Sequence, residues 1–568
     1  MGFQLSPGVN VSEIDLTTIV PAVGTTQGAY VGDFVWGPCN EIVSISNEVE
    51  LYNTFGDPDQ NTFTSFFTAA NFLAYGQNLN VVRAANTKVV LNATSGPSPV
   101  GIDNKDIYEL NYMAVPNSNT YGMFAARYPG SIGNSLLVSL WASSNANAFS
   151  TWDYYDQFDS APSTSDYVSA LNGSNDEMHI IVIDQDGLFT GAANTVLEKF
   201  SYISKASDAI NSDGSSNYYV NVINDRSNYI YIMNHAIAGG QANTTTWGLP
   251  ASNTQYTQGL NYYEKSLANG TFHMATDGDL AFGYDRFSNP EEVDISLILT
   301  GAHSTTIQQY VIDNLCETRL DCIAFVSPTM ANTVNNIGNE ADDIVNYRNL
   351  LDRSTSYAVM DSTWKYQFDK YNNVYRWVPM NGDIAGLCVR TDNTRDPWWS
   401  PAGLNRGQIK NVVKLGWNPT QSDRDTLYKN GINPIVTFPG DGTVLYGDKT
   451  LLAKPSAFDR INVRRLFIVL EKAIARAARY SLFEFNDEFT RSQFVALVEP
   501  YLRDVQGRRG IYDYRVVCDT TNNTPDVIDS NEFVGDIYIK PARSINFIQL
   551  NFIAVRTGVA FEEVVGQF

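Results

Sequence analysis

The chain has 568 residues, too many for one hydrophobic core, and we expect it to divide into about three or four domains. Its formal net charge is −23, which argues against general binding to nucleic acid. It contains no apolar run long enough to predict a transmembrane helix, so no membrane insertion is expected.

The charge is unevenly distributed. From residue 456 to the end, 14 Lys and Arg face 15 Asp and Glu, whereas the first 455 residues carry 24 basic and 46 acidic side chains. An acidic body joined to a near-neutral C-terminal region allows a partner that is reached specifically through that region. The five cysteines have irregular spacings, which indicates free and mostly buried thiols.

The first 20 residues predict an extended N-terminal arm, because their apolar side chains, Val9, Val11 and Ile14, are too sparse to form a core. Residues 21–87 then read as the start of an α/β domain. A strand within 28–37, a helix around 49–52, a strongly apolar helix over 63–75 and a strand at 80–84 are predicted.

Residues 88–289 are rich in Asn, Ser, Thr and Tyr, and predict an inserted, mainly β region of one or two domains. Strands are expected at 136–141, 179–184 and 218–223, and a helix at 195–207. The turn at 184–187 predicts a hairpin. It lacks the further carboxylates of a calcium loop, so no metal site is expected there.

The α/β pattern returns in residues 290–400. A strand at 294–300, a helix at 305–317 and a strand at 321–326 form a βαβ unit, which implies parallel pairing. The simplest arrangement adds these strands to the sheet begun by residues 28–84, so the α/β domain is discontinuous.

Residues 401–543 are predicted to form a C-terminal α+β domain, with helices over 406–428, 456–480 and 487–505. Strands are expected at 434–438, 512–518 and 535–540. Residues 544–568 would form a final strand and arm. In that strand Ile548, Leu550 and Phe552 line one face, and the other face is also apolar, so both faces require burial.

The helix at 456–480 has two distinct faces. Apolar residues recur at intervals of three and four on one face, and Arg465, Lys472, Arg476 and Arg479 recur at the same intervals on another. The basic stripe is either a solvated surface or a contact for an acidic partner.

The sequence offers no convincing catalytic or cofactor motif. The glycine-rich stretch at 442–450 resembles a phosphate loop, but Asp448 interrupts it and would repel phosphate. The four histidines lie far apart, and no nucleophile elbow occurs. We therefore expect no enzyme activity, no cofactor and no metal.

Several stretches resemble the tail sheath proteins of contractile-tailed bacteriophages of the myovirus type. The resemblance is carried by LSPGVNVSEID at residues 5–15, GAYVGDFVWGP at 28–38, YPGSIGN at 128–134 and WVP at 377–379, together with residues 395–403. In the C-terminal part it is carried by GINP at 431–434, FPG at 438–440, GDKTL at 447–451 and INVRRLF at 461–467.

The resemblance implies a structural polymer of the virion that is assembled in the cytoplasm of the host bacterium. Sheath subunits of this family form six-membered rings stacked helically around a tail tube. Their inserted domains lie outside, their C-terminal domain lies inside, and terminal arms add strands to neighbouring subunits. Contraction then drives the tube through the host envelope for genome delivery without ATP. The implied partners are further copies of the chain, the tail tube protein, and the baseplate and tail terminator proteins.

Two other functions are compatible with the sequence. One is the sheath of a phage-derived injection device, such as a tailocin, and the other is a carbohydrate-binding adhesin formed by residues 88–289. If the sheath assignment holds, Arg465, Lys472, Arg476 and Arg479 are predicted to face acidic groups of the tube. Val9, Val11, Ile14, Ile548, Leu550 and Phe552 are predicted to mediate strand and arm contacts between subunits. If the stripe is solvated instead, Arg464 and Arg465 are candidates for contacts with neighbouring subunits.

Overall fold

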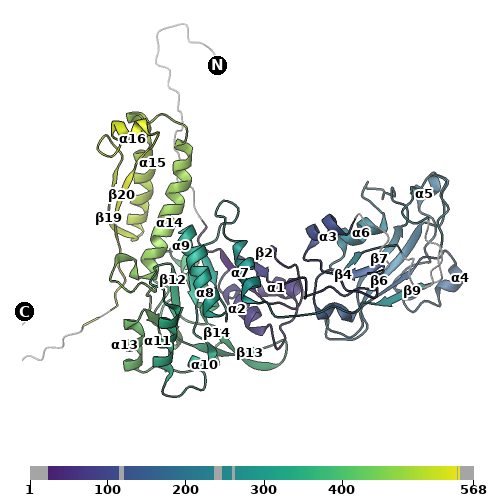
Figure 1. Cartoon of the computed structure of the whole chain (residues 1–568), viewed down its shortest axis with the longest axis horizontal. Coiled ribbons are helices and arrows are strands. Elements are labelled where there is room, and N and C mark those ends of the chain that lie inside the picture. The colour runs from purple at the N-terminus through teal and green to yellow at the C-terminus, as the bar shows by residue number, and fades with distance from the viewer. Residues whose placement is uncertain (1–23, 114–119, 236–245, 259–261, 547, 550–568) are drawn as a thin grey trace, which may run out of the picture. The chain divides into compact units, whose positions relative to one another are not determined.

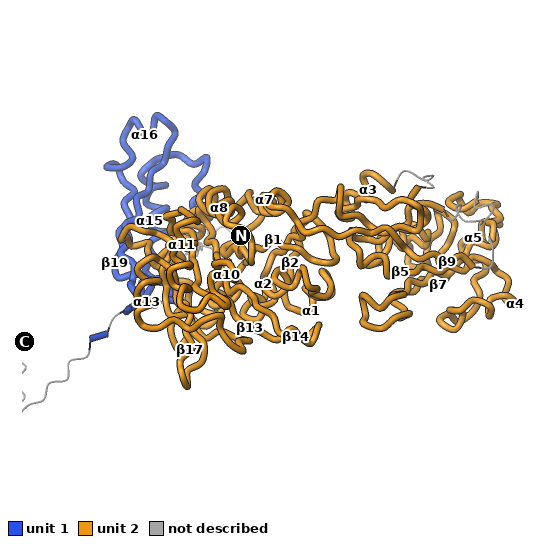
Figure 2. The backbone as a smooth tube through the Cα atoms, turned by 60° about the horizontal axis from the view of Figure 1, so that its bottom comes forward, with its two compact units in different colours: residues 1–20, 398–400, 477–568 blue, residues 21–397, 401–476 orange. Residues whose placement is uncertain are grey.

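A computed structural model describes residues 24–113, 120–235, 246–258, 262–546 and 548–549 (Figure 1). The chain forms two compact units (Figure 2). The larger unit comprises residues 21–397 and 401–476, and the smaller comprises residues 1–20, 398–400 and 477–568. The boundary between them falls within one helix, α14 (Ile461–Ala478).

The larger unit is built on a seven-stranded sheet. Its strands, in spatial order, are β16 (Ile432–Asn433), β12 (Ala358–Asp361), β11 (Ile323–Val326), β10 (Leu297–Leu299), β1 (Gly28–Gly32), β3 (Leu79–Arg83) and β2 (Ile42–Ile45). Every neighbouring pair is parallel except the edge pair of β2 and β3. The pairing of β1 with β10 confirms that the strands before and after the insertion share one sheet.

Both faces of this sheet are apolar, and helices cover each of them. One core includes residues of α1 (Glu48–Phe55), α2 (Phe63–Leu73) and α12 (Asn381–Thr394). The other includes residues of α7 (Asp277–Asp285), α8 (Thr305–Tyr310) with a π-helical turn at Val311–Cys316, α11 (Glu340–Leu351) and α13 (Gln421–Lys429). The short helices α9 (Glu317–Arg319) and α10 (Met330–Thr333) complete this part. The predicted α/β fold is confirmed.

Two smaller β elements extend the larger unit. A three-stranded sheet has the order β14 (Val374–Pro379), β13 (Trp364–Asp369) and β15 (Lys414–Leu415), and a hairpin joins β17 (Ile435–Phe438) to β18 (Gly442–Leu445). The phosphate-loop-like stretch therefore starts in the second strand of a hairpin, with no strand-to-helix turn to hold a phosphate.

The insertion forms its own core around two sheets. The larger sheet has the order β7 (Thr195–Ser204), β6 (Glu177–Asp184), β5 (Leu136–Trp141) and β9 (Tyr262–Ser266), and the smaller pairs β4 (Phe124–Ala126) with β8 (Ile230–Ile232). Its helices are α3 (Lys105–Asn111), α4 (Ala146–Phe149), α5 (Asp166–Ala170) and α6 (Tyr219–Arg226). At its base, Leu91 and Thr271 exchange backbone hydrogen bonds, so the two ends of the insertion are joined to each other.

The smaller unit is α+β. It contains α15 (Glu488–Gly507), the antiparallel pair β19 (Ile511–Val517) and β20 (Asp536–Pro541), and α16 (Pro525–Asp529). Phe494, Val498, Leu502 and Val505 form the buried face of α15. Trp398 is joined to this unit by a hydrogen bond from its indole nitrogen to the Arg508 carbonyl, at 3.2 Å.

Three local predictions are wrong. Residues 195–207 were expected to be helical, but β7 pairs along its length with β6, and two bulges shift its register. Residues 218–223 were expected to be a strand, but they begin α6, whose buried Tyr219, Val222 and Ile223 follow helical spacing. The helix expected over 406–428 is confined to α13, where Thr420 and Asp423 form a capping box.

Candidate functional site: the basic helix α14

Helix α14 confirms the amphipathic pattern. Val463, Leu466, Leu470 and Ile474 are buried on one face of the helix. The basic residues of interest lie on other faces, and the environment of each decides whether a partner can reach it.

Arg465 lies inside the protein. Its side chain and that of Asp392, from α12, are each 4% exposed and form a bidentate ion pair with N–O distances of 2.7 and 2.5 Å. Burial alone would lower the pKa of Arg465, but the carboxylate of Asp392 raises it above the ordinary value. Thr25 also donates its hydroxyl to Asp392 at 2.6 Å, so this ion pair ties α14, α12 and the residues before β1 together.

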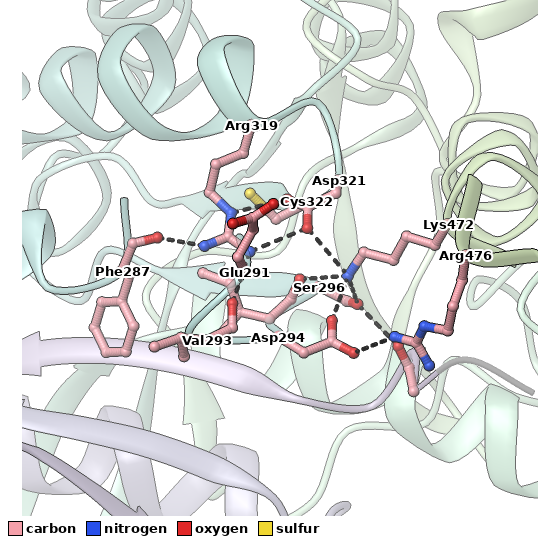
Figure 3. Close-up of polar contacts among 12 residues, drawn as sticks. Phe287, Glu291, Val293, Asp294, Ser296, Arg319, Asp321, Cys322, Lys472 and Arg476 are labelled. Carbon is pink, nitrogen blue, oxygen red and sulfur yellow. Dashed lines mark hydrogen bonds and ion pairs between the residues drawn. The ribbon is translucent and has the colours of Figure 1, made fainter. Parts of the chain in front are cut away.

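Lys472 is the centre of a second polar cluster (Figure 3). Its Nζ donates to Asp294 Oδ1 at 2.8 Å, to the Ile295 carbonyl at 2.7 Å and to Ser296 Oγ at 3.0 Å, and Asp321 Oδ2 lies 3.5 Å away. An ammonium group has three donors, so these three acceptors saturate it.

The cluster also includes a cation outside α14, Arg319. Its Nε and Nη2 contact the carboxylate of Asp321 at 2.8 and 3.0 Å, while the same guanidinium donates to the carbonyls of Phe287 and Val293 (Figure 3). Burial opposes the charge of Arg319, but Asp321 outweighs it and the pKa is raised. The Lys472 cluster is therefore an internal network that fixes α14 to the segments on either side of β10.

Arg476 and Arg479 are the exposed members of the stripe. Arg476 contacts Asp294 Oδ2 at 3.4 Å, and its side chain is 45% exposed. Arg479 follows α14 and is also exposed. The structure thus divides the four residues by exposure: Arg465 and Lys472 are largely enclosed by the protein, whereas Arg476 and Arg479 lie at its surface.

Arg464, the neighbour of Arg465, is buried as well. Its guanidinium stacks over the rings of Tyr357 and Phe458, at 4.3 and 4.1 Å from the ring centres, and donates to the Tyr357 hydroxyl at 3.0 Å. Burial lowers its pKa. These contacts of Arg464 are all with residues of the same chain.

The acidic partners Asp294, Asp321 and Asp392 were missed by sequence reasoning. They lie 73 to 182 residues from the cations of α14 that they contact, so nothing in the local sequence pairs them with that helix. The excess of acidic residues in the first 455 residues was the only available signal.

The other predicted contact residues lie mostly beyond the described residues. Val9, Val11, Ile14, Leu550 and Phe552 fall outside them, whereas Ile548 is described and highly exposed. Within the described part of the chain, no group of three or more His, Cys, Asp or Glu could hold a metal ion. None of the helices described there is long and apolar enough to cross a membrane. All five cysteines are free and buried, as predicted.

Comparisons with known proteins account for nearly the whole chain. The N-terminal region of domain III of the tail sheath protein Gp18 matches residues 26–84, the phage tail sheath central domain matches 275–451, and the phage tail sheath C-terminal domain matches 453–554. The tail sheath protein of Vibrio phage KVP40 is 34% identical over 675 aligned residues, covering 99% of this chain and 100% of the relative. That of Enterobacteria phage T4 is 34% identical over 667, covering 99% of each.

The chain belongs to the tail sheath protein family. Its α14 spans the start of the family's C-terminal domain, whereas the partners of Arg465 and Lys472 lie before that domain, most of them in the central domain. The insertion between residues 84 and 275 lies outside the matched domains.

Solved structures show the same fold. A sheath tail protein from Listeria innocua has a TM-score of 0.52 at 12% identity, over 92% of this sheath chain and 96% of that protein. The sheath complex of the extracellular contractile injection system PVC, in its contracted state, has a TM-score of 0.50 at 13% identity, over 97% and 98% of the two chains.

Proposed function

We propose that this chain is the subunit of a contractile phage tail sheath that polymerises as stacked six-membered rings around the tail tube. Contraction of the polymer drives the tube through the host envelope and delivers the genome. The observation that carries the proposal is full-length identity of 34% to tail sheath proteins of phages. The subunit acts as a structural element of the virion, assembled in the host cytoplasm, and not as an enzyme.

The contacts that α14 makes with other segments of the chain support a mechanical role. A polymer that contracts by moving rigid subunits needs each subunit to keep its shape while the contacts between subunits change. The Arg465–Asp392 pair and the Lys472 cluster fix α14 to the sheet at two places along the helix, about seven residues or 10 Å apart. Such ties would transmit force between the sheet and the C-terminal region.

The proposed partners are the tail tube, the baseplate, the tail terminator and further copies of the chain. Arg476 and Arg479 are the exposed members of the stripe, and we propose that they face acidic groups of the tube. An exposed ion pair contributes about 0–1 kcal/mol and is screened by salt, which suits a contact that must release during contraction. Val9, Val11, Ile14, Ile548, Leu550 and Phe552 are proposed to carry the permanent arm contacts, through added strands.

The test is assembly in the presence of tube and baseplate, followed by electron microscopy. Unmodified chain should form long sheaths with six-fold symmetry around the tube. Arg476→Glu combined with Arg479→Glu should reduce sheath formation on the tube at physiological salt, while Arg226→Glu combined with Arg286→Glu, two exposed arginines elsewhere, should not. Only monomers under every condition would refute the sheath proposal, and normal tails from the first double variant would refute the tube contact.

A second candidate is the sheath of a phage-derived injection device, favoured by the fold likeness to the PVC sheath complex. The higher identity to phage proteins supports the phage tail. Particles that contain a genome-filled capsid would support the phage tail, and capsid-free sheathed tubes would support the device.

A further inference from the structure

The connection between α14 and α15 exposes an unusual number of large apolar side chains. Within residues 480–489, five of them are between 63% and 104% exposed. This set, the apolar knob, consists of Tyr480, Leu482, Phe483, Phe485 and Phe489. Several large apolar side chains exposed within one short segment favour an interface, because their exposure to water is unfavourable.

The knob is held in place by polar contacts at its base. Asn486 Nδ2 donates to the Glu532 carbonyl at 2.8 Å, and Arg491 donates to Asn486 Oδ1 at 3.0 Å. The carboxylate of Asp487 caps the first turn of α15 at 2.8 Å. Phe483 has a φ of 71°, which is rare for a bulky residue. The apolar side chains are thus presented by a defined loop.

The permanence of the contact decides what kind of partner the knob fits. This step rests on the proposed function, in which the sheath releases the tube during contraction but its subunits stay connected. A contact that buries these five apolar side chains would be costly to break, because release would return them to water. The knob therefore suits a contact between copies of the chain better than one with the tube.

One segment of the chain complements the knob in both polarity and charge. Residues 543–556, RSINFIQLNFIAVR, are apolar on both faces of the predicted strand, have an arginine at each end and contain no acidic residue. The knob segment 480–490 contains Glu484, Asp487 and Glu488 and no Lys or Arg. In the described part of the C-terminal segment, Ile545 and Ile548 are 82% and 77% exposed, so a partner that buries them would remove apolar surface from water.

We propose that the apolar knob of one subunit binds the C-terminal segment 544–556 of a second copy. The aromatic side chains would cover one apolar face of that segment, while Arg543 and Arg556 would meet the acidic residues of the knob. This assigns the C-terminal arm a receptor surface distinct from the edge of the β19–β20 pair. The segment directly follows β20, and its residues 544–556 can span roughly 40 Å when extended, so it can reach beyond its own domain.

The direct test is site-specific photocrosslinking in assembled sheaths. Benzoylphenylalanine replaces Phe485 in one isotopically labelled copy, which is co-assembled with unlabelled chain, and crosslinked peptides are identified by mass spectrometry. The expected product joins residue 485 of a labelled chain to a peptide within 544–556 of an unlabelled one. The same label at Tyr375, an aromatic residue of the larger unit with half of its surface exposed, should not capture that peptide.

Other outcomes overturn the proposal. Capture of the same chain's C-terminus, of the tube protein or of another segment would each assign the knob a different partner. No crosslink in fully assembled sheaths would show that the knob stays in solvent. If the unmodified chain forms no sheath, the proposed function itself fails, which is distinguishable from these results.

A charge exchange tests the specificity of the pairing. Glu484→Lys with Glu488→Lys should reduce sheath formation at least tenfold while the variant still folds, since both side chains are exposed. Adding Arg543→Glu and Arg556→Glu should restore assembly at least partly. If the quadruple variant is as defective as the first pair, or worse, the proposed pairing is wrong.

Discussion

Removing the charge of Asp392 should destabilise the larger unit strongly. In Asp392→Asn, the amide oxygen can replace only one of the two carboxylate oxygens, so the NH₂ group faces a guanidinium nitrogen of Arg465 and the negative charge is lost. The remaining acceptors of Arg465, the carbonyls of Cys388 and Thr25, lie at 3.4 and 3.5 Å. A buried cation without its partner costs about 3–5 kcal/mol.

The assay is thermal unfolding, with proteolysis to locate the loss of structure. At about 2 °C per kcal/mol, the lower end of the range for large domains, the unfolding midpoint should fall by roughly 6–10 °C. Asp504→Asn, which removes an exposed i,i+4 pair with Arg508, is the matched control and should shift it by less than about 2 °C.

A third variant separates the charge from the packing. Arg465→Met combined with Asp392→Leu removes both buried charges and should recover more than half of the loss, because desolvation offsets most of the ion-pair attraction. A loss below about 1 kcal/mol for Asp392→Asn would refute the reasoning and show that Arg465 finds another partner or water.

Three further predictions follow from buried groups. A Cβ at Gly382, in α12, would lie 2.3 Å from the Thr68 carbonyl of α2, so Gly382→Ala should destabilise by about 1–3 kcal/mol or more. At Gly278, in α7, a Cβ would meet only Thr276 Oγ1, at an ordinary 3.7 Å, so Gly278→Ala should be neutral or stabilising. Equal unfolding midpoints for the two variants would contradict this. Burial raises the pKa of Asp361 to about 8, so the folded state keeps a proton that the unfolded state loses near pH 4. Stability should therefore fall by about 1.4 kcal/mol per pH unit between pH 4 and 8, relative to Asp361→Asn measured by urea unfolding, and a constant difference would exclude the shift. Burial lowers the pKa of His303 to about 4, so its contribution should be lost as the pH falls from about 6.5 to 4, and His303→Gln should lack this acid sensitivity in the same assay.

The sequence alone predicted the helices and strands whose apolar residues follow one clear pattern. The strands β1, β3, β10 and β11 are short runs of buried apolar residues, and α14 repeats its apolar residues at helical spacing, so these elements were predicted. Residues 195–204 were misassigned because Val196, Phe200 and Ile203 match helical spacing by chance, and the bulges that break the strand alternation arise from pairing with β6. Local spacing carries no information about a pairing partner.

The basic stripe of α14 shows the same limit of sequence-based prediction for the candidate site. Four cations at helical spacing look equivalent in the sequence, but tertiary contacts bury Arg465 against Asp392 and enclose Lys472 among Asp294, Ile295 and Ser296. Asp392 lies in α12, a helix that was not predicted, so its position beside α14 could not be anticipated. Which cations are available to a partner is a property of the fold and not of the helix alone.

The hydrogen bonds between Leu91 and Thr271 have a consequence for how the family can vary. Because they close the insertion at its base, about 180 residues are presented to the sheet as though they were one short loop. A segment anchored in this way can be lengthened, shortened or replaced by another folded module with little effect on the register of β1, β3 and β10. The insertion can therefore diversify under selection while the sheet that carries it keeps its geometry.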